Sequence, residues 1–168
     1  MPSNDELSQG ARANAAGRAY EEILAPLFQQ YGYEVLKWST WRDRGLPLEE
    51  SGKVAIKQFP YTTIYDRPGH TEWLLVNNDR GLVLRLEVKS QRKKGSVDEK
   101  LPYTYLNSLA YPENKVILLV DGAGFREGSI PWLKRMVEER WLQDEYGYKD
   151  IQVLNLSEFI AVFIAELS

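Results

Sequence analysis

Three charged side chains lie close enough in the sequence to carry chemistry together. Glu87 and Lys89 stand two residues apart, and Glu72 precedes them on the other side of the turn-forming segment 77–81. Two carboxylates brought together repel one another, and a hard divalent cation such as Mg²⁺ relieves that repulsion. An ammonium group beside the cation could stabilise charge that develops on a phosphate, or orient an attacking water. These residues predict metal-assisted chemistry on a phosphate group.

The segments that carry these residues are typical of the two arms of a β-hairpin. Residues 71–76 and 82–89 have strand character, and Asn, Asp and Gly fill the turn between them. Since side chains alternate along a strand, one face of the second arm is aliphatic and the other carries Glu87 and Lys89. Pairing about the turn would set Glu72 opposite either Arg85 or Glu87, and the sequence leaves both registers open.

Each part of this pattern also has an ordinary structural interpretation. A Glu-x-Lys triplet arises easily by chance, and an acid and a lysine on neighbouring strands are commonly a surface ion pair. The combination is more specific, because a basic segment follows it in a chain of net charge −3. The Lys and Arg residues of this segment, which could also be a solvated loop, are Arg85, Lys89, Arg92, Lys93, Lys94 and Lys100.

Several strings resemble those of the PD-(D/E)XK nucleases found in phages and restriction systems. The resemblance covers about residues 12–140, and its strings are Gly17-Arg18-Ala19-Tyr20-Glu21, residues 60–65, Gly69-His70-Thr71-Glu72-Trp73, Leu86-Glu87-Val88-Lys89-Ser90-Gln91, residues 95–103 and residues 116–122.

The resemblance implies a role for each matching residue. Glu72 stands at the family's first acid, Glu87 and Lys89 stand at its (D/E)xK positions, and Glu21 matches a first-helix Glu that faces the metal. Gln91 and Lys100 would lie near the same site, with Gln91 counted among the catalytic residues. Thr71 replaces the usual Pro, and Glu72 is one methylene longer than the usual Asp.

Other polar residues are candidates for contacting DNA. Arg92, Lys93, Lys94 and Lys100 would contact phosphates and position the substrate without reading its sequence. Ser96, after Gly95, could bind a phosphate or simply form a turn. His70, the single histidine, could be a general base, a substrate contact or a structural residue.

The remaining chain predicts an α/β fold, restriction-endonuclease-like by the resemblance, with a mixed central sheet flanked by helices. Pro26 should kink or split the first helix, and residues 39–53 should be a loop or insertion. The other expected elements are a helix over 11–31, strands over 33–38, 54–56, 62–65, 116–121 and 151–154, a turn over 67–69, a helix over 98–109, a helix capped by Ser129 that runs to Leu142, and a last helix started by Asn155 and Glu158.

Length and composition narrow the class of protein. A chain of 168 residues is one ordinary domain, which we expect over residues 11–168 after a flexible N-terminus at 1–10. The absence of Cys excludes disulfides and thiolate sites, and no apolar run approaches a membrane span, so a cytoplasmic protein is expected. An aromatic content of 12% fits either an aromatic core or a recognition surface.

These observations together predict an endodeoxyribonuclease that needs Mg²⁺, with Mn²⁺ as a substitute. Glu72, Glu87 and Glu21 would bind the metal. The expected substrate is duplex DNA cut in the restriction manner, for which a homodimer is one expectation although no self-association motif is visible. The alternatives are a phage-type nuclease selective for branched or damaged DNA, and a catalytically inactive DNA-binding or protein-binding module.

Overall fold

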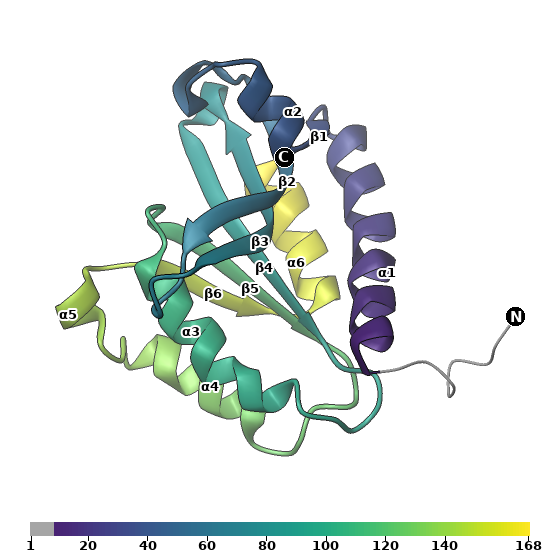
Figure 1. Cartoon of the computed structure of the whole chain (residues 1–168), viewed down its shortest axis with the longest axis vertical. Helices are drawn as coiled ribbons and strands as arrows, with labels where there is room; N and C mark the ends of the chain where they lie inside the picture. Colours follow the sequence, from purple (N-terminus) through teal and green to yellow (C-terminus); the bar gives the residue numbers. More distant parts are fainter. Residues whose placement is uncertain (1–8) are drawn as a thin grey trace, which may run out of the picture.

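The computed structural model describes the backbone of residues 9–168 and the side chains from Arg18 onward, as one mixed sheet between helices (Figure 1). The predicted flexible N-terminus falls mostly on residues 1–8, which lie outside the described residues. Residues 9 and 10 already belong to the first helix. Among the described residues no helix has the length and hydrophobicity to span a membrane.

Six strands follow one another across the sheet in chain order, so neighbours in sequence are neighbours in space. Strands β2, β3 and β4 are antiparallel to their neighbours, whereas β1 pairs with β2, β5 with β4, and β6 with β5 in parallel. The strands are β1 (Glu34–Lys37), β2 (Lys53–Thr62), β3 (Pro68–Asn77), β4 (Leu82–Ser90), β5 (Lys115–Asp121) and β6 (Asp150–Leu154). The predicted mixed α/β fold is confirmed.

Helices cover both faces of this sheet. They are α1 (Gln9–Gln30), α2 (Trp38–Asp43), α3 (Leu101–Ala110), α4 (Ser129–Glu138), α5 (Gln143–Tyr146) and α6 (Leu156–Val162), with short 3-10 turns at Leu48–Glu50, Asn78–Arg80 and Asp98–Lys100 and a closing π-helical turn at Phe163–Leu167.

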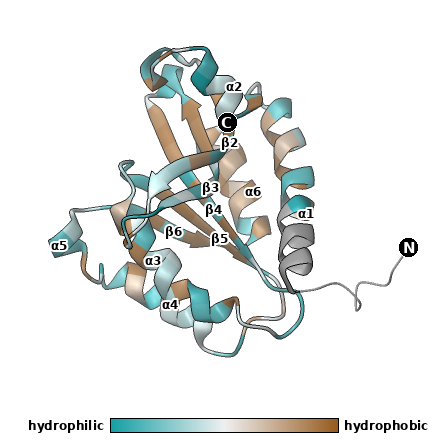
Figure 2. Ribbon diagram, in the orientation of Figure 1, coloured by the Kyte–Doolittle hydropathy of each residue, from teal (hydrophilic) through white to brown (hydrophobic). Residues whose placement is uncertain are grey.

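Three hydrophobic clusters line the faces of the sheet in the described part of the chain, and the hydrophobic residues concentrate on the central strands (Figure 2). Helices α1 and α6 pack on the predicted aliphatic face of β4, where Leu84 and Leu86 are fully buried. Helices α3 and α4 pack on the other face, against Val116 and Leu118 of β5. The polar face of β4 is therefore covered as well, so its charged residues need partners.

Several local expectations were wrong. Helix α1 continues through Pro26, so the split expected there is wrong, whereas the kink stays a prediction. The segment 39–53 contains α2 and a 3-10 turn. The strand expected over 54–56 is part of the longer strand β2, which ends at Thr62, so most of the strand expected over 62–65 is not formed. Ser129 does not cap α4, because Gly128 holds that position and the Ser129 hydroxyl donates to the carbonyl of Arg126. The capping box of Asn155 and Glu158 is confirmed.

The β2–β3 hairpin diverges from β4 halfway along its length. Registered pairs between β3 and β4 run from Asn77↔Leu82 only as far as Trp73↔Leu86, whereas β2 and β3 stay paired to Thr62↔Pro68. At the divergence Gln58 has a φ of 55°, which is unusual for a residue other than glycine. The distal hairpin is thereby free to turn across the α3 face of the sheet (Figure 1).

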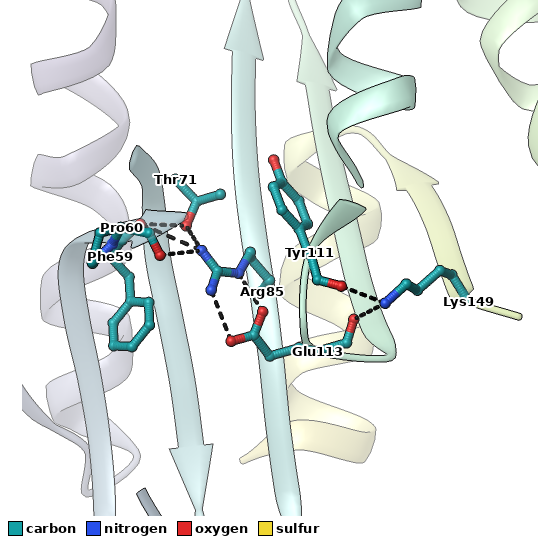
Figure 3. Close-up of polar contacts among 7 residues, drawn as sticks. All are labelled: Phe59, Pro60, Thr71, Arg85, Tyr111, Glu113 and Lys149. Carbon is teal, nitrogen blue, oxygen red and sulfur yellow. Dashed lines mark hydrogen bonds and ion pairs between the residues drawn. The ribbon is translucent and has the colours of Figure 1, made fainter. Parts of the chain in front are cut away.

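A buried arginine holds the diverging hairpin (Figure 3). Arg85 of β4 is inaccessible, and its Nε and Nη2 donate to the two carboxylate oxygens of Glu113 at 2.6 and 2.7 Å. Its Nη1 donates to the carbonyl of Pro60 at 3.2 Å and to the hydroxyl of Thr71 at 3.3 Å. Lys149 in turn donates to the carbonyl of Glu113 at 3.1 Å. The guanidinium thus ties both hairpin strands to the segment that follows α3.

Replacing Arg85 should destabilise the fold strongly. In Arg85→Met the carboxylate of Glu113 stays buried without its cation, so we expect the free energy of unfolding to fall by about 3–5 kcal/mol. Urea denaturation measures this change. Arg42→Met is the matched control, because Arg42 forms an exposed pair with Asp43 and its loss should cost at most about 1 kcal/mol. Equal losses in the two variants would contradict the role assigned to Arg85.

Candidate active site

The predicted acid–lysine cluster forms where the hairpin leaves β4. Glu87 and Lys89 share one face of β4, and the Lys89 ammonium donates to Oε1 of Glu87. Trp73 pairs with Leu86. In this register the next position of β3, Glu72, corresponds to Glu87 of β4 and not to Arg85, so the structure decides between the two registers that the sequence left open.

Glu72 occupies the gap between the diverging strands. Its Oε2 accepts from the backbone N–H of Val88 at 2.9 Å, a donor that lies beyond the last registered β3–β4 pair. The divergence thus brings one carboxylate from each strand together.

Burial gives this pair unusual electrostatics. Desolvation first, and the charge of Glu72 second, raise the pKa of Glu87 to about 8. Burial by itself would lower the pKa of Lys89, but the charges of Glu87 and Glu72 together raise it above its ordinary value. Lys89 therefore stays cationic at neutral pH, whereas the raised pKa of Glu87 favours its protonated form.

The donor set fits a hard divalent cation. Oε2 of Glu87 is buried and has no hydrogen-bond partner, so one carboxylate oxygen remains to be satisfied. No group of three or more Asp, Glu or His side chains placed to hold a metal occurs among the described residues. Mg²⁺ commonly binds through one or two carboxylates and keeps waters or substrate phosphate oxygens as its other ligands, so two carboxylates suffice.

The structure does not bring Glu21 into this cluster. Its carboxylate on α1 accepts from the ammonium of Lys57, a β2 residue whose Nζ also lies over the ring of Trp73, 5.5 Å from the centroid. Trp73 belongs to the cluster packed under α1, on the sheet face opposite Glu87. Neither Glu72 nor Glu87 forms a metal-holding group with Glu21.

Gln91 positions the loop that follows β4. Its side-chain N–H donates to the carbonyl of Gly124 at 2.6 Å, and its Oε1 accepts from the N–H of Val97 at 2.7 Å. Gly124 approaches so closely that a Cβ there would lie 2.4 Å from the carbonyl oxygen of Lys93. Both polar groups of Gln91 are thus engaged with backbone, and the structure shows a positioning role rather than contact with the carboxylates.

The candidate DNA contacts lie on the segment that follows β4 and on β3. Arg92, Lys93, Lys94 and Lys100 are exposed on the loop held by Gln91, and Ser96 is half-buried. Within that loop, Asp98 and Glu99 lie 3.4 Å from the guanidinium of Arg126. His70 is exposed on β3, two residues before Glu72.

Two tyrosines beside the cluster were missed at the level of sequence. Tyr61 of β2 and the buried Tyr111 meet edge to face at 4.7 Å between ring centroids. Burial first, and the charge of Glu87 second, raise the pKa of both phenols. No spacing signal links either residue to Glu87, because the divergence of the hairpin brings Tyr61 there.

Comparison with known proteins agrees with the geometry. A family model described as a PD-(D/E)XK nuclease superfamily domain matches residues 12–166. No curated protein and no solved structure matches the chain.

Metal binding should strengthen as the pH rises. The proton on Glu87 competes with the cation, so the affinity for Mg²⁺ should rise by up to about tenfold per pH unit between pH 6 and 8. The shift of the thermal midpoint with added Mg²⁺, compared at pH 6, 7 and 8, measures this change.

Glu87→Gln should abolish the Mg²⁺-induced shift at every pH. Glu34→Gln is the control, since Glu34 is an exposed carboxylate paired with Arg44 away from the cluster. A shift that persists in Glu87→Gln would exclude Glu87 as a metal ligand.

Proposed function

This chain belongs to the PD-(D/E)XK nuclease superfamily, and we propose that it is a Mg²⁺-dependent endonuclease that hydrolyses phosphodiester bonds in DNA. The observation that carries the proposal is the buried Glu87, which bonds Lys89 through one oxygen and has no partner for the other. A fold that only binds DNA has no need to bury such a carboxylate beside Glu72, since the arrangement costs stability.

Glu72 and Glu87 would hold the cation, with Mn²⁺ as a substitute for Mg²⁺. When bound, the cation supplies Lewis acidity toward a phosphate oxygen and toward water. Glu72 is already oriented by the N–H of Val88, which fixes its carboxylate in the gap between β3 and β4. Two ligands of fixed geometry reduce the reorganisation needed when substrate arrives.

Lys89 acts as a fixed positive charge. Its raised pKa keeps the ammonium protonated at neutral pH, so it stabilises negative charge developing on the phosphate rather than taking a proton from water. Its side chain is 23% exposed against 8% for Glu87, so the ammonium lies on the solvent side of the cluster, where a phosphate arrives.

The basic residues around the site would position DNA. Arg92, Lys93, Lys94 and Lys100 supply phosphate contacts, and Ser96 and His70 supply hydrogen bonds close to the cluster. Glu21 pairs with Lys57 on the sheet face opposite Glu87, so the proposed site does not use it. The leading substrate is duplex DNA cut in the restriction manner, with a homodimer delivering a cut to each strand.

Cleavage of supercoiled plasmid should require both Mg²⁺ and Lys89. We expect Lys89→Ala to slow cleavage by about 10²–10³-fold, as does loss of one charge-stabilising donor in other enzymes, and EDTA to stop it. Gel electrophoresis of the plasmid against time gives the rates.

Lys134→Ala is the matched control, because Lys134 is an exposed lysine on α4 and its loss should leave the rate unchanged. Cleavage that survives in Lys89→Ala would place the chemistry elsewhere. No cleavage of plasmid, of branched DNA or of single strands by the wild-type protein would favour the inactive binding module.

A further inference from the structure

Two tyrosines from different elements stack at the tip of the β2–β3 hairpin. The ring of Tyr65, in the turn, and the ring of Tyr103, in the first turn of α3, lie 5.3 Å apart between centroids with 25° between their planes. Tyr65 is 67% exposed, the most exposed of the large hydrophobic side chains in the described part of the chain. Tyr103 covers one side of its ring, and the exposure leaves the rest open to solvent.

Buried polar groups hold this hairpin tip in one conformation. The N–H of Thr63 donates to the carbonyl of Arg67 at 2.8 Å, and the N–H of Asp66 donates back to the carbonyl of Thr63 at 2.9 Å. The N–H of Ile64 donates to the side chain of Asn107 on α3 at 3.0 Å.

The same asparagine fixes the second ring. Asn107 is 1% exposed, and its side-chain N–H donates to the carbonyl of Tyr103 at 2.9 Å. One buried amide therefore sets the positions of the backbones that carry both rings. A packing role does not explain the arrangement, because Tyr65 remains exposed although its backbone is fixed.

Tyr61 connects the aromatic pair with the carboxylate cluster electrostatically. This β2 residue stands four positions before Tyr65, and its phenol interacts with Glu87, Tyr103 and Lys89. Strand β3 runs back from this tip through the exposed His70 to Glu72.

A basic residue stands near each ring in the chain. Arg67 is exposed in the same turn as Tyr65, and Lys100 is exposed three residues before Tyr103. A flat exposed ring with basic residues nearby in the chain matches a nucleobase and its phosphates rather than an apolar protein surface, since bases stack on aromatic rings while basic groups contact the backbone.

We propose that Tyr65, backed by Tyr103, is a stacking platform for an unpaired base of the DNA substrate. This inference rests on the proposed nuclease function, and in place of intact duplex it favours DNA with unpaired nucleotides near the cut, such as single strands, flaps or junctions. Paired bases are stacked on their neighbours and offer no open face, so intact duplex gains nothing from the platform. The order imposed on the tip lowers the entropic cost of adding a base to the stack.

Binding of a labelled oligonucleotide tests the platform independently of catalysis. A single strand of about 12 nucleotides containing 2-aminopurine is titrated with protein, with Ca²⁺ in place of Mg²⁺, alongside a duplex of the same sequence. The wild-type protein should quench the 2-aminopurine and bind the single strand more tightly. Tyr65→Ala should weaken that binding by roughly 5- to 150-fold and remove the quenching, with little effect on the duplex.

Two variants separate stacking from folding. Tyr65→Phe keeps the ring and should bind like the wild-type protein. Tyr148→Ala removes another exposed tyrosine, 60% accessible on the connection between α5 and β6, and should change nothing. Equal binding of single strand by Tyr65→Ala and the wild-type protein, or no preference of the wild-type protein for the single strand, would overturn the platform.

Cleavage distinguishes this failure from failure of the proposed function. If the wild-type protein cuts duplex and flap substrates at equal rates, and Tyr65→Ala cuts them at the same rates, the protein is a nuclease and the platform is contradicted. If the wild-type protein cuts no substrate but Tyr65→Ala loses single-strand binding, the platform is supported and the proposed nuclease activity is contradicted.

Discussion

The fold depends on a buried cation, the guanidinium of Arg85, which has no access to solvent. Arg85 is buried between the hairpin and the chain after α3, and a guanidinium stays charged at every accessible pH. Its burial is tolerated because Glu113, Thr71 and the carbonyls of Phe59 and Pro60 accept its hydrogen bonds. Those acceptors lie on three segments far apart in sequence, so satisfying one side chain fixes where the distal hairpin lies. Glu87 lies two residues after Arg85 on the same face of β4. The bonds of Arg85 therefore order the strand that also carries the proposed metal ligand.

The divergence of β3 from β4 gives the site its form. A continuous pairing would use the N–H of Val88 in the sheet and close the space beside Glu87. Because pairing stops after Trp73, that N–H is free to orient Glu72, and the two carboxylates meet without a strand hydrogen bond between them. The loss of pairing with β4 is thus confined to the half of the hairpin beyond Trp73, and β2 and β3 stay paired with each other there. The paired half, from Trp73 to Asn77, keeps the aliphatic core, and the diverging half carries the polar groups.

The sequence predicted the parts of this site that depend on local pattern. Strict alternation in β4 identified its aliphatic face and set Glu87 and Lys89 together, and the Asn/Asp/Gly turn identified its partner strand. The bend could not be predicted, because nothing marks Gln58 as a residue that adopts a positive φ. For the same reason Pro68-Gly69 was taken as a turn when it begins β3, and Thr62–Tyr65 as a strand when most of it is turn. Glu21 was assigned by family spacing, which cannot foresee its pairing with Lys57. Long-range contacts decided each of these cases.

One rigid hairpin links the two halves of the proposed chemistry. Glu72 lies at its bend and Tyr65 at its tip, and the bonds of Arg85 and Asn107 fix the segment between them to β4 and α3. In the proposed complex, a base held at the tip would have a set distance and direction to the carboxylates at the bend. Such coupling would convert binding of an unpaired nucleotide into alignment of a phosphate at the carboxylates, which is where remote binding energy contributes to catalysis. A flexible hairpin with the same residues would bind the base and leave the phosphate unplaced. The buried polar bonds, which add little to net stability for their number, are better explained by this demand for alignment than by folding alone.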